Sequence, residues 1–201
     1  MDVGSGVILT VVLLIIFTSL RNVTAPVQPS AGVTPPAYWQ LSEQEREVEP
    51  QLIRHYIYKN VGHRLDEKII SFMADCIVRF GTEFKVDPVF VTALIKRESG
   101  FIPDKVSPSG AVGLGQVKPV TARGLGVNDL FDIEQNVKTT IWYLRKMLDL
   151  WNGYENQIKL ALASYKEGYG TIKRSAGRYS AQTAGYIEDI FTYYKWIKLL
   201  R

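Results

Sequence analysis

Apolar residues recur at helical spacing along most of the chain from about residue 50 onward. The stripes they form cover residues 69–84, 91–95, 133–148, 158–165 and 187–197. The first stripe begins at Ile69 and continues through Met73 and Ile77. No alternating strand pattern of useful length and no internal repeat is present. The pattern therefore predicts an all-α body.

Capping residues indicate where several of these helices begin and end. Asp87 followed by Pro88 is typical of an N-cap and first helical turn, and predicts a helix that ends near Ser99. Gly168 and Gly170 are expected to end the helix that contains the fourth stripe. A long polar loop with several glycines separates the second stripe from the third, and long loops in compact domains are often functional.

The first 42 residues differ in character from the body. Residues 3–20 are uncharged and predominantly apolar, and a helix of that length spans about 27 Å, just short of a ~30 Å hydrocarbon core. We expect an uncleaved membrane anchor over residues 1–21, with a removable signal segment as the alternative. Residues 22–42 contain four prolines and predict an extended linker.

Composition excludes several classes of protein. With 46% apolar and 22% charged residues, the chain can bury a core and is not disordered overall. Its single cysteine, Cys76, cannot form an intrachain disulfide, and its place on an apolar helix face predicts a buried structural thiol. His55 and His63 have no Cys/His cluster near them, so we expect no metal site and no cofactor.

Charge is distributed unevenly along the chain. Residues 1–100 hold 10 basic and 11 acidic side chains, whereas residues 101–201 hold 14 basic and 9 acidic ones. A basic C-terminal half favours a polyanionic partner such as an acidic cell-wall polymer, and solubility alone is the alternative. The basic residues form no run with interleaved aromatic residues, so we expect no nucleic-acid partner.

The most informative stretch covers residues 94–116. Glu98 follows Val91, Leu94 and Ile95 at helical spacing, and a glycine-rich loop with few charges comes next. Desolvation at the edge of an apolar surface raises the pKa of a carboxyl group, so the group can hold a proton near neutral pH. Glycoside cleavage needs an acid of this kind.

The glycines of this loop have two interpretations. Gly110, Gly113 and Gly115 can adopt positive φ and let a sugar approach the backbone. The second interpretation is structural, because two closely packed helices would also require glycine at these positions.

Residues 86–200 resemble the soluble lytic transglycosylase family of bacterial cell-wall enzymes, whose fold is similar to goose-type lysozyme. The matching motifs occur in order over a little more than half of the chain, and this ordered set is far more specific than any single motif. They are residues 98–101, residues 107–116 with Pro119 and Thr121-Ala122, Asn136, Tyr143-Leu144, residues 161–165 with Gly168, and Tyr186. The resemblance implies a lysozyme-like helical fold.

The resemblance also implies roles for particular residues. Glu98 would be the catalytic acid. Ser99 and Gln116 would bind the sugar or position the acid, and Tyr165 and Tyr186 would close the site around the reacting sugar. The alternatives are a surface carboxylate at a helix end for Glu98, a helix cap for Ser99 and a solvated loop residue for Gln116. Both tyrosines lie on apolar stripes, so packing alone is the alternative for each of them.

Gly113, Leu114 and Lys166 complete the implied substrate-binding set. Lys166 departs from the family, which usually has asparagine at this position. A cation here either binds a carboxylate of the substrate or lowers the pKa of Glu98 and weakens its role as an acid. Thr140 stands where the family tends to have glycine, and we expect this difference to affect helix packing only.

The implied reaction is cleavage of the β-1,4 bond between N-acetylmuramic acid and N-acetylglucosamine in peptidoglycan, with formation of 1,6-anhydromuramic acid. Most glycosidases use two carboxylates, whereas the motif supplies only Glu98. Two alternatives remain: a muramidase that hydrolyses the same bond, and a catalytically weak or inactive glycan-binding scaffold of an envelope machine.

The expected organisation therefore has four parts. An anchor or signal segment (1–21) and a linker (22–42) precede helices over 43–85, which pack on a transglycosylase-like catalytic domain over 86–201. The expected partners are peptidoglycan glycan strands and the inner membrane, with envelope-spanning machinery as a further candidate. We expect the protein on the periplasmic side of the bacterial inner membrane, or secreted if the first segment is removed.

Overall fold

The computed structural model of the protein describes residues 43–200, and the side chains of residues 50–200. Eight α-helices occur in this part of the chain: α2 (Glu43–Val61), α3 (Glu67–Glu83), α4 (Pro88–Glu98), α5 (Pro119–Arg123), α6 (Ile133–Leu150), α7 (Gln157–Glu167), α8 (Tyr169–Arg174) and α9 (Ala181–Lys198). Two isolated antiparallel bridges, Val106 with Val112 and Val112 with Val117, are the only extended pairings there. The predicted all-α body is confirmed. The expected anchor and linker lie outside the described residues.

Helix α4 lies at the centre of the fold. The Asp87 carboxylate accepts hydrogen bonds from the backbone N–H groups of Val89 and Phe90, at 2.7 and 3.3 Å, and Pro88 occupies the first turn, as predicted. Residues 88–95 are all buried. The helix is therefore enclosed on every side instead of burying a single stripe. It packs mainly against α9, and also against α2 and α3.

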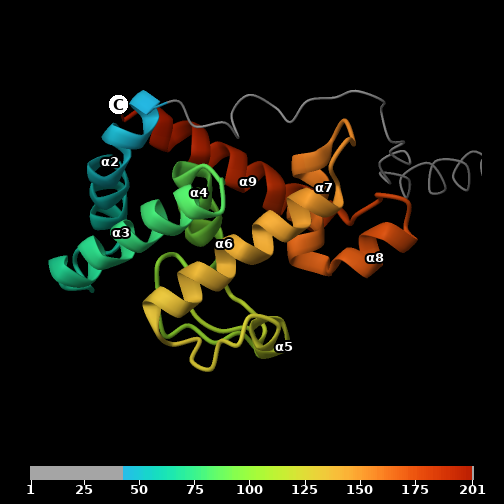
Figure 1. Cartoon of the computed structure of the whole chain (residues 1–201), viewed down its shortest axis with the longest axis horizontal. Helices are drawn as coiled ribbons and strands as arrows, with labels where there is room; N and C mark the ends of the chain where they lie inside the picture. The colour runs from blue at the N-terminus through green and yellow to red at the C-terminus, as the bar shows by residue number, and fades with distance from the viewer. Residues whose placement is uncertain (1–42, 201) are drawn as a thin grey trace, which may run out of the picture.

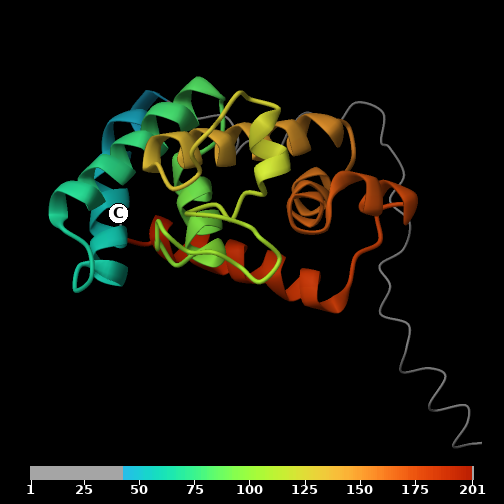
Figure 2. The same ribbon diagram turned by 90° about the horizontal axis from the view of Figure 1, so that it is seen from below.

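The other helices surround α4 in an elongated arrangement. Helices α2 and α3 pack on each other at one end of the molecule, and α8 lies at the opposite end (Figure 1). Helix α6 runs between these ends and contacts α3 and α7. The segment between α4 and α6, which contains α5, lies against α6 in both views (Figures 1 and 2).

Tertiary packing changed three details of the predicted helices. Ile69 is 38% exposed, and its neighbour Ile70 is fully buried in its place. Gly168 ends α7 as predicted, but Gly170 lies inside α8, which the pattern did not predict. Helix α5 was also missed. Both helices have six residues or fewer, and so short a segment shows too little periodicity to be recognised.

Two further sequence predictions concern burial and membranes. Cys76 is 1% exposed, so the predicted buried thiol is confirmed. Over residues 43–200, none of the helices combines the length and the apolar character that crossing a bilayer requires.

Candidate active site

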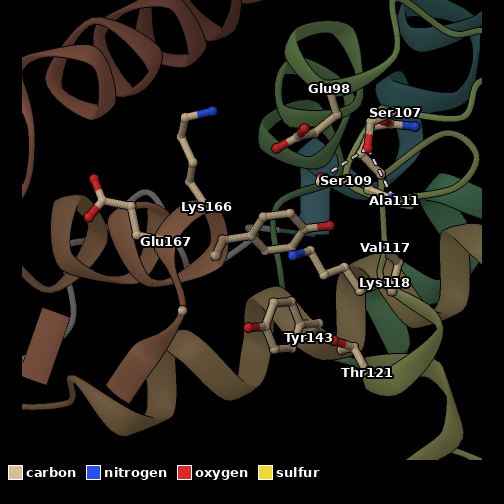
Figure 3. A pocket seen from close by; sticks show the side chains of 13 residues that line it. Glu98, Ser107, Ser109, Ala111, Val117, Lys118, Thr121, Tyr143, Lys166 and Glu167 are labelled. Atoms are coloured by element: carbon tan, nitrogen blue, oxygen red, sulfur yellow. Dashed lines mark hydrogen bonds between the residues drawn. The ribbon is translucent and has the colours of Figure 1, made fainter. Parts of the chain in front are cut away.

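Glu98 is the last residue of α4 and opens onto a pocket of about 320 Å³. The pocket lies between the end of α4, the α4–α6 loop and the helices α6 and α7. Its lining residues are Glu98, Ser107, Ser109, Ala111, Gln116, Val117, Lys118, Thr121, Tyr143, Tyr165, Lys166, Glu167 and Gly168. Glu98 lies on one wall, and Lys166 and Glu167 lie across from it on α7 (Figure 3).

Tyr186 holds the carboxyl group of Glu98. Its hydroxyl donates a hydrogen bond of 2.5 Å to Glu98 Oε1, and its side chain, on α9, is 1% exposed. Two cations lie near the Tyr186 ring: Lys166 Nζ at 4.7 Å and Arg97 Cζ at 5.3 Å from the ring centroid. Tyr186 therefore contacts Glu98 through its hydroxyl group and two cations, from α7 and α4, through its ring.

Burial raises the pKa of Glu98 above its ordinary value. The Tyr186 hydrogen bond acts in the opposite direction, as do the charges of Lys166, Arg97 and Lys105, but burial is the larger effect. The pKa values of Tyr165 and Tyr186 are raised well above their usual range, first by burial and then by the charge of Glu98. Both phenols therefore stay protonated and can donate hydrogen bonds.

The chain turns sharply after Glu98. Ser99 caps α4, donating to the carbonyl of Ile95 and accepting from the N–H of Phe101 at 3.1 Å. Gly100 and Phe101 both have positive φ, at 66° and 67°. Ser99 is 3% exposed and does not line the pocket. Both contacts are those of a helix cap, the alternative interpretation of this residue.

The loop after this turn is fixed to α6 by Asn136. This side chain accepts a hydrogen bond from the N–H of Gly115 and donates to the carbonyls of Val112 and Leu130, at 2.7–3.0 Å. Gly115 also lies against Thr140, so closely that a Cβ there would overlap the threonine side chain. The residue expected to affect helix packing therefore contacts the loop that forms one wall of the pocket.

The predicted loop residues divide into two groups. Gln116 lines the pocket, and its amide donates to the carbonyls of Lys105 and Gly113, at 3.0 and 2.9 Å. Gly113 has a φ of 75°, and its neighbour Asn136 leaves no room for a Cβ. Leu114 is fully buried in the core and does not line the pocket. The Leu114 side chain therefore faces the core instead of this pocket.

Helix α7 supplies the facing wall. The Tyr165 hydroxyl donates to the carbonyl of Gly115 at 2.8 Å, and its ring lies 5.1 Å from that of Tyr143. Glu167 accepts hydrogen bonds from the N–H and hydroxyl of Ser180, which caps α9. Lys166 is exposed to the pocket.

Of the eight residues predicted for the site, Glu98, Gln116, Tyr165 and Lys166 line the pocket, and Tyr186 lies directly behind Glu98. Sequence reasoning missed Tyr143 and Glu167 as lining residues. Tyr143 belongs to the Tyr143-Leu144 motif, one of the motifs on which the resemblance depends. Its place in that motif could have indicated that it belongs to the site. Glu167 lies beside Lys166 in another of these motifs, where the chain departs from the usual family sequence, so a signal was present there too.

Comparison with known proteins identifies the family. The sequence model described as "Transglycosylase SLT domain" matches residues 75–187, which is more than half of the chain. The match includes Glu98, the whole α4–α6 loop and Tyr186.

Individual relatives share this region. A membrane-bound lytic murein transglycosylase F from Desulfosudis oleivorans is 40% identical over 86 residues, covering 41% of this chain and 19% of the relative. A transglycosylase from Enterobacteria phage PRD1 is 34% identical over 86 residues, covering 43% of this chain and 31% of the relative. The matched region thus spans less than a third of either relative.

Solved structures show the same fold. The 70 kDa soluble lytic transglycosylase from Escherichia coli matches with a TM-score of 0.55 at 19% identity, covering 80% of this chain and 31% of that one. An inactive mutant of lytic transglycosylase Slt from Pseudomonas aeruginosa gives 0.53 at 23% identity, covering 61% and 23%. The lysozyme-like helical fold implied by the resemblance is confirmed, and the chain belongs to the transglycosylase SLT domain family.

Proposed function

We propose that the protein is a lytic transglycosylase that cleaves the β-1,4 bond between N-acetylmuramic acid and N-acetylglucosamine in peptidoglycan. The observation that carries the proposal is the environment of Glu98. Its carboxyl group is half-buried at a pocket, is hydrogen-bonded by a protonated phenol, and has a raised pKa. A raised pKa favours the protonated form, in which the group can act as a general acid and then take a proton back as a base.

The reaction uses one carboxyl group twice. Glu98 donates its proton to the bridging oxygen as the bond from that oxygen to the muramoyl C1 breaks. The 2-acetamido group of the same sugar stabilises the positive charge that develops. The ionised Glu98 then takes the proton of the muramoyl 6-hydroxyl group. As the proton leaves, the oxygen of this hydroxyl group bonds to C1 and closes the 1,6-anhydro ring. No water is consumed, and Glu98 returns to its protonated state.

Supporting roles follow from the contacts described above. Tyr186 holds the Glu98 carboxyl group in place and stabilises its ionised form. Tyr165 joins the loop to α7, Gln116 holds the loop together through Lys105 and Gly113, and both offer polar edges to the sugar. Ser99 acts indirectly, by positioning the end of α4.

The test combines product mass with one substitution. Purified peptidoglycan incubated with the protein should release muropeptides that are one water lighter than the products of a lysozyme. Glu98→Gln keeps the shape of the side chain but removes the acid. We expect it to lower turnover by about a thousandfold while glycan binding is retained. Full activity of Glu98→Gln would refute the assignment, and binding without turnover in the unmodified protein would indicate a glycan-binding scaffold.

Hydrolysis is the second candidate, because Glu167 supplies another carboxylate to the same pocket. A muramidase would use it to activate a water molecule on the far side of the sugar. Glu167 is instead engaged by Ser180, so we expect Glu167→Gln to change turnover only severalfold and to leave the anhydro product unchanged. Hydrated products that disappear in Glu167→Gln would establish hydrolysis.

We further propose that residues 1–21 anchor the protein to the inner membrane and that residues 22–42 link the anchor to helices over 43–85 and a catalytic domain over 86–201. Support comes from the apolar N-terminal run and from relatives described as membrane-bound. The enzyme would then act on the periplasmic side. Fractionation with and without residues 1–25 tests this: the full chain should sediment with membranes and the shortened chain should not. Equal behaviour of the two chains would contradict the anchor.

A further inference from the structure

The ammonium group of Lys166 differs from those of Lys96 and Lys105, which have hydrogen-bond acceptors, and Lys166 is one of the two lysines that line the pocket, together with Lys118. Lys105 donates to the carbonyl of Glu98 at 2.6 Å, and Lys96 donates to Asn60 at 2.5 Å. Within residues 50–200, by contrast, Lys166 Nζ has neither a hydrogen-bond acceptor nor a carboxylate at ion-pair distance. It lies in the pocket, 4.7 Å from the centroid of the Tyr186 ring.

The charge of the pocket favours an anionic ligand. Its charged lining residues besides Glu98 are Lys118, Lys166 and Glu167. When Glu98 carries its proton, ready to act as an acid, two ammonium groups therefore face a single carboxylate. That carboxylate already accepts two hydrogen bonds from Ser180. A negatively charged group on the substrate would complement Lys166.

Only one of the two sugars in peptidoglycan supplies such a group. N-acetylmuramic acid carries a lactyl ether, which ends in a carboxylate when free and in an amide when a peptide is attached. We propose that Lys166 is a specificity-determining residue that binds a carboxylate on the muramoyl substituent next to the bond that Glu98 cleaves. The proposal rests on the transglycosylase function proposed above and deepens it by naming the preferred substrate: glycan whose muramoyl substituent is anionic.

This carboxylate has two sources. One is the free lactyl group of strands that have lost their peptides, and the other is a carboxylate of the attached peptide. Recognition is the same in both cases, since an ammonium group makes a charge-assisted hydrogen bond to a carboxylate and loses it when the carboxylate becomes an amide. Three substrates separate the sources: peptide-free strands, strands with unmodified peptides, and strands in which every carboxylate has been converted to an amide.

The experiment measures kcat/KM of the full chain and its variants on the three substrates. Lys166→Met removes the charge and keeps most of the side-chain length, whereas Lys166→Arg keeps the charge. Lys173→Met is the matched control, because Lys173 also lies over a tyrosine ring, at 5.5 Å from Tyr169, but does not line the pocket. If Lys166→Met does not fold, as judged by circular dichroism, Lys166→Gln replaces it.

We expect Lys166→Met to lower kcat/KM on carboxylate-bearing strands by about three- to tenfold relative to its effect on amidated strands, because any change in the pKa of Glu98 acts on all three substrates alike. Lys166→Arg should retain most of the preference, and Lys173→Met all of it. A loss confined to peptide-free strands identifies the lactyl carboxylate, and a loss confined to peptide-bearing strands identifies the peptide. An equal loss on all three substrates, or none, overturns the proposal. The Glu98→Gln result and the product mass do not depend on Lys166, so the two proposals can fail separately.

Discussion

The proposed chemistry depends on a single carboxyl group, that of Glu98. Its neighbours shift its pKa in opposite directions. Burial raises the pKa of Glu98, whereas Tyr186 and three nearby cations lower it. A general acid that later acts as a base works best when its pKa lies near the working pH. In the proposed reaction these residues would set the pKa of one side chain for two steps, and each of them can be tested by its effect on pH dependence.

The first prediction at this scale concerns stability. The pKa of Glu98 is raised in the folded state. The protonated carboxyl group therefore contributes fully to stability below the pKa of the unfolded chain, about 4.3. This contribution is lost as the pH rises through the pKa of the folded protein. Glu98→Gln cannot ionise, so it avoids this loss. We expect the variant to gain stability relative to the unmodified protein as the pH rises from 4 to 8. Thermal unfolding of both proteins across this range measures the difference. A constant difference in Tm would show that folding does not raise the pKa of Glu98.

The second prediction concerns the Tyr186 hydroxyl. Its hydrogen bond favours the ionised form of Glu98, so Tyr186→Phe should raise the pKa of the acid. Loss of activity at high pH reports the deprotonation of this acid. We therefore expect the alkaline limb of the kcat/KM profile to move to higher pH in Tyr186→Phe. Tyr165→Phe is the control, because that hydroxyl binds the Gly115 carbonyl and not Glu98. An unmoved limb in Tyr186→Phe would remove Tyr186 from the tuning of the acid.

At the scale of elements, the pocket depends on how the α4–α6 loop is docked onto α6. Regular backbone pairing in this loop is limited to isolated bridges, so side chains from helices hold it. Asn136 bonds three of its backbone groups, and Tyr165 bonds a fourth from α7. Gly115 lies at the centre of this contact, against Thr140. A loop held at a few points responds sharply to a change at any one of them.

Gly115→Ala tests this contact, because its Cβ would overlap the Thr140 side chain. We expect the substitution to lower the free energy of unfolding by about 1–3 kcal/mol and to reduce activity. Thr140→Gly makes space for the new methyl group, so the double variant should be more active than Gly115→Ala alone. Gly185→Ala is the control, since its Cβ meets no atom within 4 Å. Denaturant unfolding and turnover measure these effects. A double variant no better than Gly115→Ala would place the damage elsewhere.

For the whole molecule, the position of the acid depends on contact between α4 and α9. Glu98 ends α4, and its phenol partner Tyr186 belongs to α9, 88 residues later in the chain. The same helices meet again where α4 begins. There the buried Asp87 carboxylate accepts a hydrogen bond from Tyr194 at 2.8 Å and lies 3.6 Å from Lys198 Nζ. Polar contacts at both ends of α4 thus fix its register against α9.

Asp87→Ala tests this connection. It removes both the cap of α4 and the link to α9, so we expect it to lower the free energy of unfolding by about 2–4 kcal/mol. Asp66→Ala is the matched control. Asp66 caps α3 through a single hydrogen bond to Lys68 N in an exposed position, and its loss should cost about 1 kcal/mol. Urea unfolding of both variants gives the comparison. Equal losses would mean that Asp87 acts only as a cap.

Helical periodicity and capping were sufficient to predict most of the fold. The pair Asp87-Pro88 correctly predicted the start of α4, because a cap is set by a residue's immediate neighbours. The choice between Ile69 and Ile70 was wrong, because adjacent positions fit a helical stripe almost equally well and only the neighbouring helix decides between them. Helices α5 and α8 were too short to show a period.

The amino-acid sequence by itself determined the helical architecture, the acid at the end of an apolar helix and the loop that follows it. Those features depend on local spacing and residue type. Only the tertiary structure decided which side chains surround the acid: Tyr186 lies against its carboxyl group, and Lys166 and Glu167 lie across the pocket. It also decided that Leu114 lies in the core. These relations join residues that are far apart in the chain. They arise because packing buries some groups and leaves others at the pocket, and burial in turn sets the pKa on which the proposed chemistry depends.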